Sequence, residues 1–134
     1  MWAQVVNESP VGIALIGPDG SYRSVNPAYA RLYGYSQADM PGRPFTVVFP
    51  PDDRQRVLAR HQAFIGGGVE LRGESRVVRR DGTVFDVLVE SVRLLGADGQ
   101  VNRLVYVVDI TARRQAEQAL RRAERFASSV LDDL

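Results

Sequence analysis

Three Asp-Gly pairs constrain the fold of this chain more than any other feature of its sequence. They are Asp19-Gly20, Asp81-Gly82 and Asp98-Gly99, and each lies between two runs rich in apolar residues. Asp-Gly favours tight turns between strands, because glycine accepts the positive φ that such turns require and aspartate bonds to the backbone of the turn. Strands joined by short turns are antiparallel neighbours. The sequence therefore predicts a sheet of antiparallel strands.

The order of the elements follows from the apolar period along the chain. Two short strands are expected first and a group of helices next, ending at Gly66-Gly67-Gly68. Beyond these glycines the period changes from helical to alternating, which predicts three successive strands. The five expected strands are 11–16, 22–25, 69–80, 83–95 and 100–109. This order predicts an α+β fold with one antiparallel sheet and helices over one of its faces.

A short helix after the second strand has both of its ends specified by the sequence. Asn26 is a preferred N-cap, Pro27 suits the first helical position, and Gly34 supplies the left-handed residue beyond the C-terminus. A Ser36–Asp39 capping box is expected to open a one-turn helix. A longer helix is expected from Asp52, because apolar residues recur there at helical spacing.

Composition and charge exclude several classes of protein. The 134 residues are 45% hydrophobic and 25% charged, as expected for a soluble globular domain. A net charge of +1 gives no basic field for nucleic acid. No apolar run reaches the roughly 20 residues of a membrane span, and the N-terminus lacks the features of a signal peptide. The expected location is the cytoplasm, either alone or as the cytoplasmic part of a larger sensor.

The chain has no cysteine and a single histidine, His61, which limits its chemistry. Disulfides, thiolate metal sites, a cysteine nucleophile and a thiol-linked chromophore are excluded. Gly66-Gly67-Gly68 is not followed by the Lys-Ser/Thr helix of a phosphate loop, and no HExxH-like spacing is present. With no nucleophilic, metal or phosphoryl-transfer set, the chain is predicted not to be an enzyme.

Several motifs, taken in order, closely resemble those of a PAS domain. They are Val25-Asn26-Pro27-Ala28-Tyr29, Leu32-Tyr33-Gly34-Tyr35-Ser36, Gly42, Arg79-Arg80-Asp81-Gly82-Thr83 and Asp109-Ile110-Thr111. The resemblance covers Trp2 to Thr111. It implies a five-stranded antiparallel sheet in the spatial order 2-1-5-4-3, with short helices on one face and a C-terminal signalling helix. It also implies a module that senses small molecules, light or redox state, or dimerises, and relays to a fused output domain.

Matching the chain to this family places alternate strand residues under the helices. The inward set is Gly73, Ser75, Val77, Phe85, Val87, Val89, Ser91, Val105 and Val107. Small side chains at Gly73, Ser75 and Ser91 leave room for a cavity, unless Phe64 or Phe85 fills the space. The ligand-binding residues predicted from this placement are Tyr33, Val57, His61, Ser75, Val89, Ser91 and Val105.

The identity of a cofactor stays open at the level of the sequence. In haem-binding PAS domains the helix expected here from Asp52 carries the iron ligand, and matching puts Val57, not His61, at the ligand position. Haem is therefore argued against. The flavin adduct of light-sensing members needs a cysteine, which the chain lacks. Non-covalent flavin stays open, although the Trp and Asn that flank the third strand in redox-sensing members are absent, and the identity of the cofactor is unknown.

The chain is expected to divide into an N-terminal amphipathic cap helix at 1–9, a PAS core at 10–111 and a coiled-coil-type helix at 112–134. Thr111 is expected to cap this last helix, with Asp109 holding the junction by hydrogen bonds or an arginine pair. Its apolar stripe is Ala116, Ala119, Leu120, Ala123, Phe126, Ala127, Val130 and Leu134. The outward face of the sheet is too apolar to be exposed to solvent in a monomer; its residues are Leu88, Val92, Leu104, Tyr106 and Val108. Together with the N-terminal segment, these surfaces predict a parallel homodimer.

Two functions remain open on this reading. The first is a ligand-responsive sensor module that relays through its C-terminal helix to an output domain, a histidine kinase or a cyclic-dinucleotide enzyme. The second is a ligand-free dimerisation and relay module. The segment 126–133 resembles 2–9 over a short stretch, and whether a second PAS domain follows Leu134 stays open.

Overall fold

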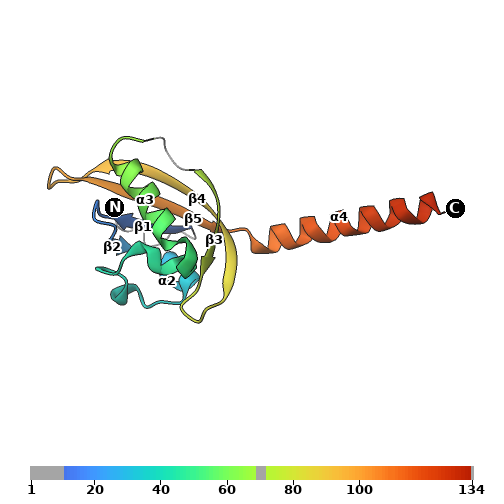
Figure 1. The fold of residues 1–134 in the computed structure, drawn as a ribbon. Helices are drawn as coiled ribbons and strands as arrows, with labels where there is room; N and C mark the ends of the chain where they lie inside the picture. Colours follow the sequence, from blue (N-terminus) through green and yellow to red (C-terminus); the bar gives the residue numbers. More distant parts are fainter. Residues whose placement is uncertain (1–10, 69–71, 134) are drawn as a thin grey trace.

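A five-stranded antiparallel sheet forms the body of the molecule in the computed structural model, which describes residues 11–68 and 72–133 (Figure 1). The strands are β1 (Gly12–Ile16), β2 (Tyr22–Val25), β3 (Arg72–Val78), β4 (Val84–Leu95) and β5 (Val101–Asp109). They lie in the order β2-β1-β5-β4-β3, and every neighbouring pair is antiparallel. The expected fold class and strand order are confirmed. The cap helix expected at 1–9 lies outside the described residues.

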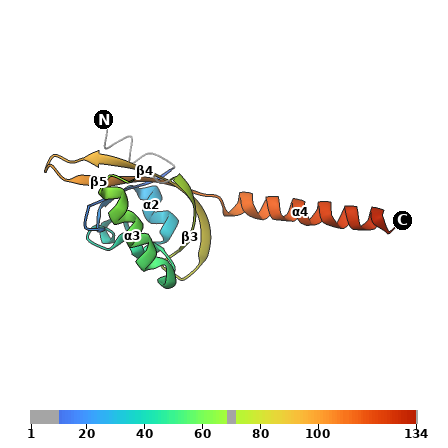
Figure 2. The ribbon, with the colours of Figure 1, turned by 45° about the horizontal axis from the view of Figure 1, so that its top comes forward.

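The helices between β2 and β3 lie over one face of the sheet, as Figure 2 shows for α2 and α3. They are α2 (Pro27–Tyr33), the 3-10 turns η1 (Gln37–Asp39), η2 (Phe45–Val48) and η3 (Pro51–Asp53), and α3 (Arg54–Ile65). The helix expected from Asp52 therefore starts as a 3-10 turn and continues as α3. The last helix, α4 (Thr111–Asp132), projects away from the sheet (Figure 1). None of the described helices is long and apolar enough to cross a bilayer.

The three Asp-Gly turns share one local structure. In each, the aspartate side chain accepts a hydrogen bond from the backbone N–H two residues later, at 3.0 Å for Asp19, 2.9 Å for Asp81 and 2.9 Å for Asp98. The glycines have φ values of 85°, 90° and 78°. A residue with a Cβ would be strained at these angles. The turns that the sequence predicts are confirmed.

Asn26 caps α2 and also joins it to the first strand. Its side-chain oxygen accepts from the backbone N–H of Tyr29 at 2.9 Å, which confirms the predicted N-cap. The same oxygen accepts from the N–H of Ile13 at 2.9 Å, and the side-chain nitrogen donates to the carbonyl of Val11 at 2.8 Å. The side chain is fully buried. One residue therefore satisfies backbone groups in two elements.

Two expected helix caps are wrong. Ser36 precedes η1 but makes no side-chain capping hydrogen bond, so the capping box does not form. Thr111 is the first residue of α4, and Ile110 holds the N-cap position. The hydroxyl of Thr111 bonds instead to the backbone N–H and carbonyl of Asp86 in β4. It is therefore not available to cap α4. Asp109 accepts from the backbone N–H of Thr111 at 2.9 Å and so holds the junction, as the sequence predicts.

The core lies between the helices and the inward face of the sheet. The predicted inward residues Val77, Phe85, Val87, Ser91, Val105 and Val107 are buried. An aromatic layer packs over them from Tyr22, Tyr29 and Tyr33, with the hydroxyls of Tyr22 and Tyr29 hydrogen-bonded at 2.6 Å. Gly73 shares this face by register, opposite Val89, but it is exposed because β3 is the edge strand.

Replacing Asn26 by alanine should lower the free energy of unfolding by about 2–4 kcal/mol, since the cap is lost and buried backbone groups are left unsatisfied. The measurement is urea denaturation followed by circular dichroism. Ser36→Ala is the matched control, because Ser36 precedes a helical turn without capping it, and it should cost less than about 0.5 kcal/mol. Equal effects of the two substitutions would contradict the role given to Asn26.

Candidate functional site

A cavity of about 120 Å³ lies between the helices and the β3–β4–β5 side of the sheet. Its lining residues are Phe45, Phe49, Val57, Arg60, Arg72, Gly73, Glu74, Ser75, Val89 and Arg103. The η2 turn, Phe49 after it and α3 supply apolar walls and Arg60, while the edge strand β3 forms the mouth. Among the described residues, no cluster of three or more His, Asp or Glu side chains could hold a metal ion.

The residues predicted to bind a ligand fall into two groups. Val57, Ser75 and Val89 line the cavity. The other four are fully or nearly fully buried and lie outside its lining; they are Tyr33, His61, Ser91 and Val105. A ligand role for any of the seven stays a prediction.

The sequence reasoning missed several lining residues, and Arg103 is the one among them that is both charged and buried; the others are Phe45, Phe49, Arg60, Arg72 and Glu74. Arg103 lies on β5 two residues before Val105, so strand alternation alone would have placed it on the inward face. Its side chain lines the cavity although the residue is only 7% exposed. Nε donates to the hydroxyl of Ser91 at 2.8 Å. Burial lowers the pKa of Arg103, because the charged form is poorly solvated there.

His61 is a neutral core residue. The carbonyl of Gly17 can only accept, so Nε2, at 3.1 Å from it, carries the proton and donates. Nδ1 is sealed from solvent and has no partner in the described part of the chain. Burial and the nearby charge of Arg103 lower the pKa of His61, against smaller opposing effects of the Gly17 and Pro18 carbonyls and the Asp19 carboxylate. The ring packs on Phe45 with centroids 5.0 Å apart.

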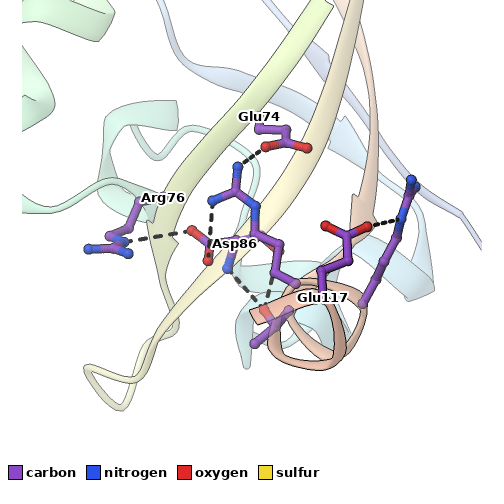
Figure 3. A network of polar contacts seen from close by, with 7 residues as sticks. Glu74, Arg76, Asp86 and Glu117 are labelled. Atoms are coloured by element: carbon purple, nitrogen blue, oxygen red, sulfur yellow. Dashed lines mark hydrogen bonds and ion pairs between the residues drawn. The ribbon is translucent and has the colours of Figure 1, made fainter. Parts of the chain in front are cut away.

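The base of α4 is attached to the outer side of the strands that bound the cavity (Figure 3). Arg114 of α4 forms an ion pair with Glu74 of β3 and lies 3.7 Å from Asp86 of β4. Arg76 approaches the same Asp86 carboxylate at 3.6 Å. Glu74 stands between Gly73 and Ser75, both of which line the cavity. The edge strand β3 therefore touches the cavity and α4 at neighbouring residues.

A second arginine, Arg79, stabilises the start of α4 from the side of the sheet that the helices cover. Arg79 lies 3.6 Å from the carboxylate of Asp109, and its guanidinium stacks over the ring of Phe85 with 3.9 Å to the centroid. The same side chain donates to the carbonyl of Leu32 in α2 at 2.6 Å. The arginine pair that the sequence analysis expected at Asp109 is present, and it connects the last strand to the helical layer.

Comparison with known proteins gives matches along most of the chain. The family model described as PAS fold matches residues 6–115. The chain is 25% identical over 126 residues to the sensor histidine kinase TmoS of Ectopseudomonas mendocina, covering 92% of this chain and 13% of that protein. It is 28% identical over 112 residues to the probable diguanylate cyclase DgcE of Escherichia coli, covering 82% of this chain and 10% of that protein. The chain thus spans a small part of the length of these relatives.

The fold is shared with solved structures. The crystal structure of the PAS domain of a protein from Colwellia psychrerythraea matches with a TM-score of 0.74 and 23% sequence identity, covering 83% of this chain and 95% of that one. At this sequence identity the similarity shows a shared fold. It does not show a shared ligand or a shared partner.

His61 should make the stability of the domain depend on pH. Its pKa in the folded state lies below that of the unfolded chain, about 6.5. The native state therefore binds fewer protons than the unfolded state. The stabilisation linked to neutral His61 is complete above about pH 6.5 and is lost as the pH falls toward the folded-state pKa. Urea unfolding between about pH 7.5 and 5.5 should show the decline, and His61→Gln should flatten it. Since His61 is the only histidine, an equal decline in the variant would contradict this assignment.

Proposed function

The chain belongs to the PAS-fold family of sensory modules, and from this premise we propose that it is the sensory module of a multidomain signal-transduction protein. It binds a small molecule in the cavity between the sheet and the helices and relays the event through α4. The observation that carries the proposal is the double contact of β3, whose residues line the cavity and hold the base of α4. The relatives TmoS and DgcE are a kinase and a probable cyclase, which supports an output domain of one of these two classes.

Ligand binding is supported by the size and the walls of the cavity. A dry cavity of about 150 Å³ in another protein holds benzene, so a cavity of this order suits a molecule with about six heavy atoms. The lining offers a ligand both apolar surface and polar groups. The apolar side chains are Phe45, Phe49, Val57 and Val89, and the polar ones are Arg60, Arg72, Glu74, Ser75 and Arg103. We place the molecule between η2, α3 and β3.

Relay is supported by the position of Glu74. A ligand that displaces Gly73 or Ser75 moves the residue between them, and that residue forms an ion pair with Arg114 of α4. Asp86 and Thr111 fix the same helix turn to β4. A small shift of β3 against β4 thus changes the angle at which α4 leaves the sheet.

Homodimerisation is supported by the surface of α4. Leu120 is 60% exposed and Phe126 is 72% exposed on a helix without a buried residue. A parallel partner helix would cover this stripe, and the half-buried outer sheet residues Leu88 and Tyr106 would extend the contact. The N-terminal segment expected to join this contact lies outside the described residues.

A ligand-free dimerisation and relay module is the second candidate function. It is favoured by the Ser91 hydroxyl, which accepts from Arg103. A hydroxyl that was expected to face a ligand is thus already satisfied within the protein. In either function we place the module in the cytoplasm and assign no catalysis to it.

Replacing Gly73 by phenylalanine should fill the cavity from its mouth. A Cβ at Gly73 meets no heavy atom within 4 Å, so the fold should survive. A ligand at 100 times its Kd stabilises the native state by about 2.7 kcal/mol, which thermal unfolding detects. Compounds from a panel of small carboxylates, alcohols and aromatic hydrocarbons that stabilise the wild type should lose their effect on Gly73→Phe and keep it on Gly73→Ala. If no compound stabilises the wild type, the ligand-free module is favoured.

A charge in the stripe of α4 should weaken the dimer. Leu120→Glu introduces like charges facing one another at the proposed two-fold axis, and its dissociation constant should rise at least about tenfold. Gln118→Glu is the matched control, because it adds the same charge on the opposite side of α4 and should leave the constant nearly unchanged. Sedimentation equilibrium measures both. A wild-type chain that is monomeric at high concentration would show that this stripe is not an interface.

A further inference from the structure

We propose that the ligand of the cavity is a small organic carboxylate with an apolar body, and that Arg103 binds its carboxylate group. This inference rests on the ligand-binding function proposed above and adds the chemical class of the ligand. It starts from the one buried charge on the cavity wall that has no counter-ion in the described part of the chain.

Arg103 presents unused hydrogen-bond donors to the cavity. Only its Nε has a hydrogen-bond partner among the described residues, the hydroxyl of Ser91. The unpartnered polar side-chain atoms that are sealed from solvent belong to His61 and Arg93. The Nη atoms of Arg103 are therefore open to the cavity that the residue lines. A guanidinium with two free amino groups matches the two oxygens of a carboxylate.

The charges around Arg103 add to its own and do not cancel it. Arg93 stands directly opposite Arg103 in the β4–β5 register, and Arg60 lines the same cavity from α3. None of these three arginines forms an ion pair with a carboxylate among residues 11–68 and 72–133. The one acidic residue of the lining, Glu74, pairs with Arg114 on the outer side of the sheet (Figure 3). The cavity therefore carries an uncompensated positive charge.

The rest of the cavity determines what kind of anion fits. Phe45 and Phe64 lie beside the Arg103 guanidinium, with ring centroids 5.7 Å and 5.4 Å from its central carbon, and these contacts offset part of the cost of burial. Phe49, Val57 and Val89 complete the apolar side. An inorganic phosphate would leave oxygens against these walls, where they lose water without gaining hydrogen bonds. A carboxylate with a short aliphatic chain satisfies both sides.

The test uses acetate and butyrate as probes, with butyramide as the neutral molecule of the same shape as butyrate. Isothermal titration and thermal unfolding of the wild-type protein are followed up to about 10 mM of each compound. At least one carboxylate should bind, and butyrate should bind about 10- to 100-fold more tightly than butyramide, as expected for a buried hydrogen bond to a charged group.

Arg103→Met removes the charge and keeps an apolar stem. Because an unpaired buried charge is lost, the ligand-free variant should unfold at the same or a higher temperature than the wild type, while carboxylate affinity falls about 10- to 100-fold. Arg103→Gln is the second variant, since its amide can still donate to Ser91, and it should lose carboxylate affinity as well. Arg56→Met, an exposed residue of α3 outside the lining, removes the same charge and should leave binding unchanged.

Each outcome decides one of the two proposals. Equal binding of butyrate and butyramide, or unchanged carboxylate affinity in both Arg103 variants, overturns the carboxylate assignment and leaves a ligand-binding module. Binding of neutral compounds but of no carboxylate also overturns the carboxylate assignment and leaves a ligand-binding module. If no carboxylate binds to the wild type at any concentration tested, the assignment is overturned, and the panel of the Gly73 experiment then decides whether the cavity binds a ligand at all.

Discussion

The side chain of Asn26 fixes how α2 meets the sheet, and the buried half of the domain depends on that contact. A seven-residue helix is too short to be stable in water on its own. Asn26 ties it to β1 by accepting from the backbone of both elements and donating to the carbonyl of Val11, just before the strand. With α2 held there, Tyr29 and Tyr33 reach the inward side chains of the sheet. The hydrogen bond between Tyr22 and Tyr29 satisfies their hydroxyls in the interior. These hydrogen bonds fix the helical layer to the sheet on the side of β1 and β2.

The other side of the domain is built differently. Here the helices leave a cavity, and the wall that closes it is an edge strand, β3, which is hydrogen-bonded only to β4. An edge strand has one neighbour to hold it, so it moves at lower cost than the central β5. The ion pair between Glu74 and Arg114 makes the same strand one of the attachments of α4. β3 thus lines the cavity and also holds the base of the projecting helix, as the proposed relay requires.

The antiparallel sheet and its turns could be predicted because their signals are local, while the strand order came from the resemblance to the PAS family. An Asp-Gly turn, an Asn-Pro helix start and a period of two each depend on a few neighbouring residues. Two of the failures are features that depend on distant partners. Thr111 was expected to cap α4, but the backbone of Asp86, far away in the sequence, takes its hydroxyl. Arg103 follows the alternation that places Val105 inward, yet its charge argues for solvent. It is buried because Ser91 and the rings of Phe45 and Phe64 surround it, and these come together only in the folded chain.

The proposed ligand site gives a reason for the presence of Arg103 in the interior. A buried charge without a counter-ion costs free energy, and an apolar residue of similar volume would make the ligand-free domain at least as stable. Stacking on two aromatic rings offsets part of this cost and cannot remove it. Residues that weaken a fold in this way are concentrated at functional sites. An anion bound at Arg103 would neutralise the charge, and in the proposed function the free energy of its binding is available to shift β3, the strand that lines the cavity and holds α4.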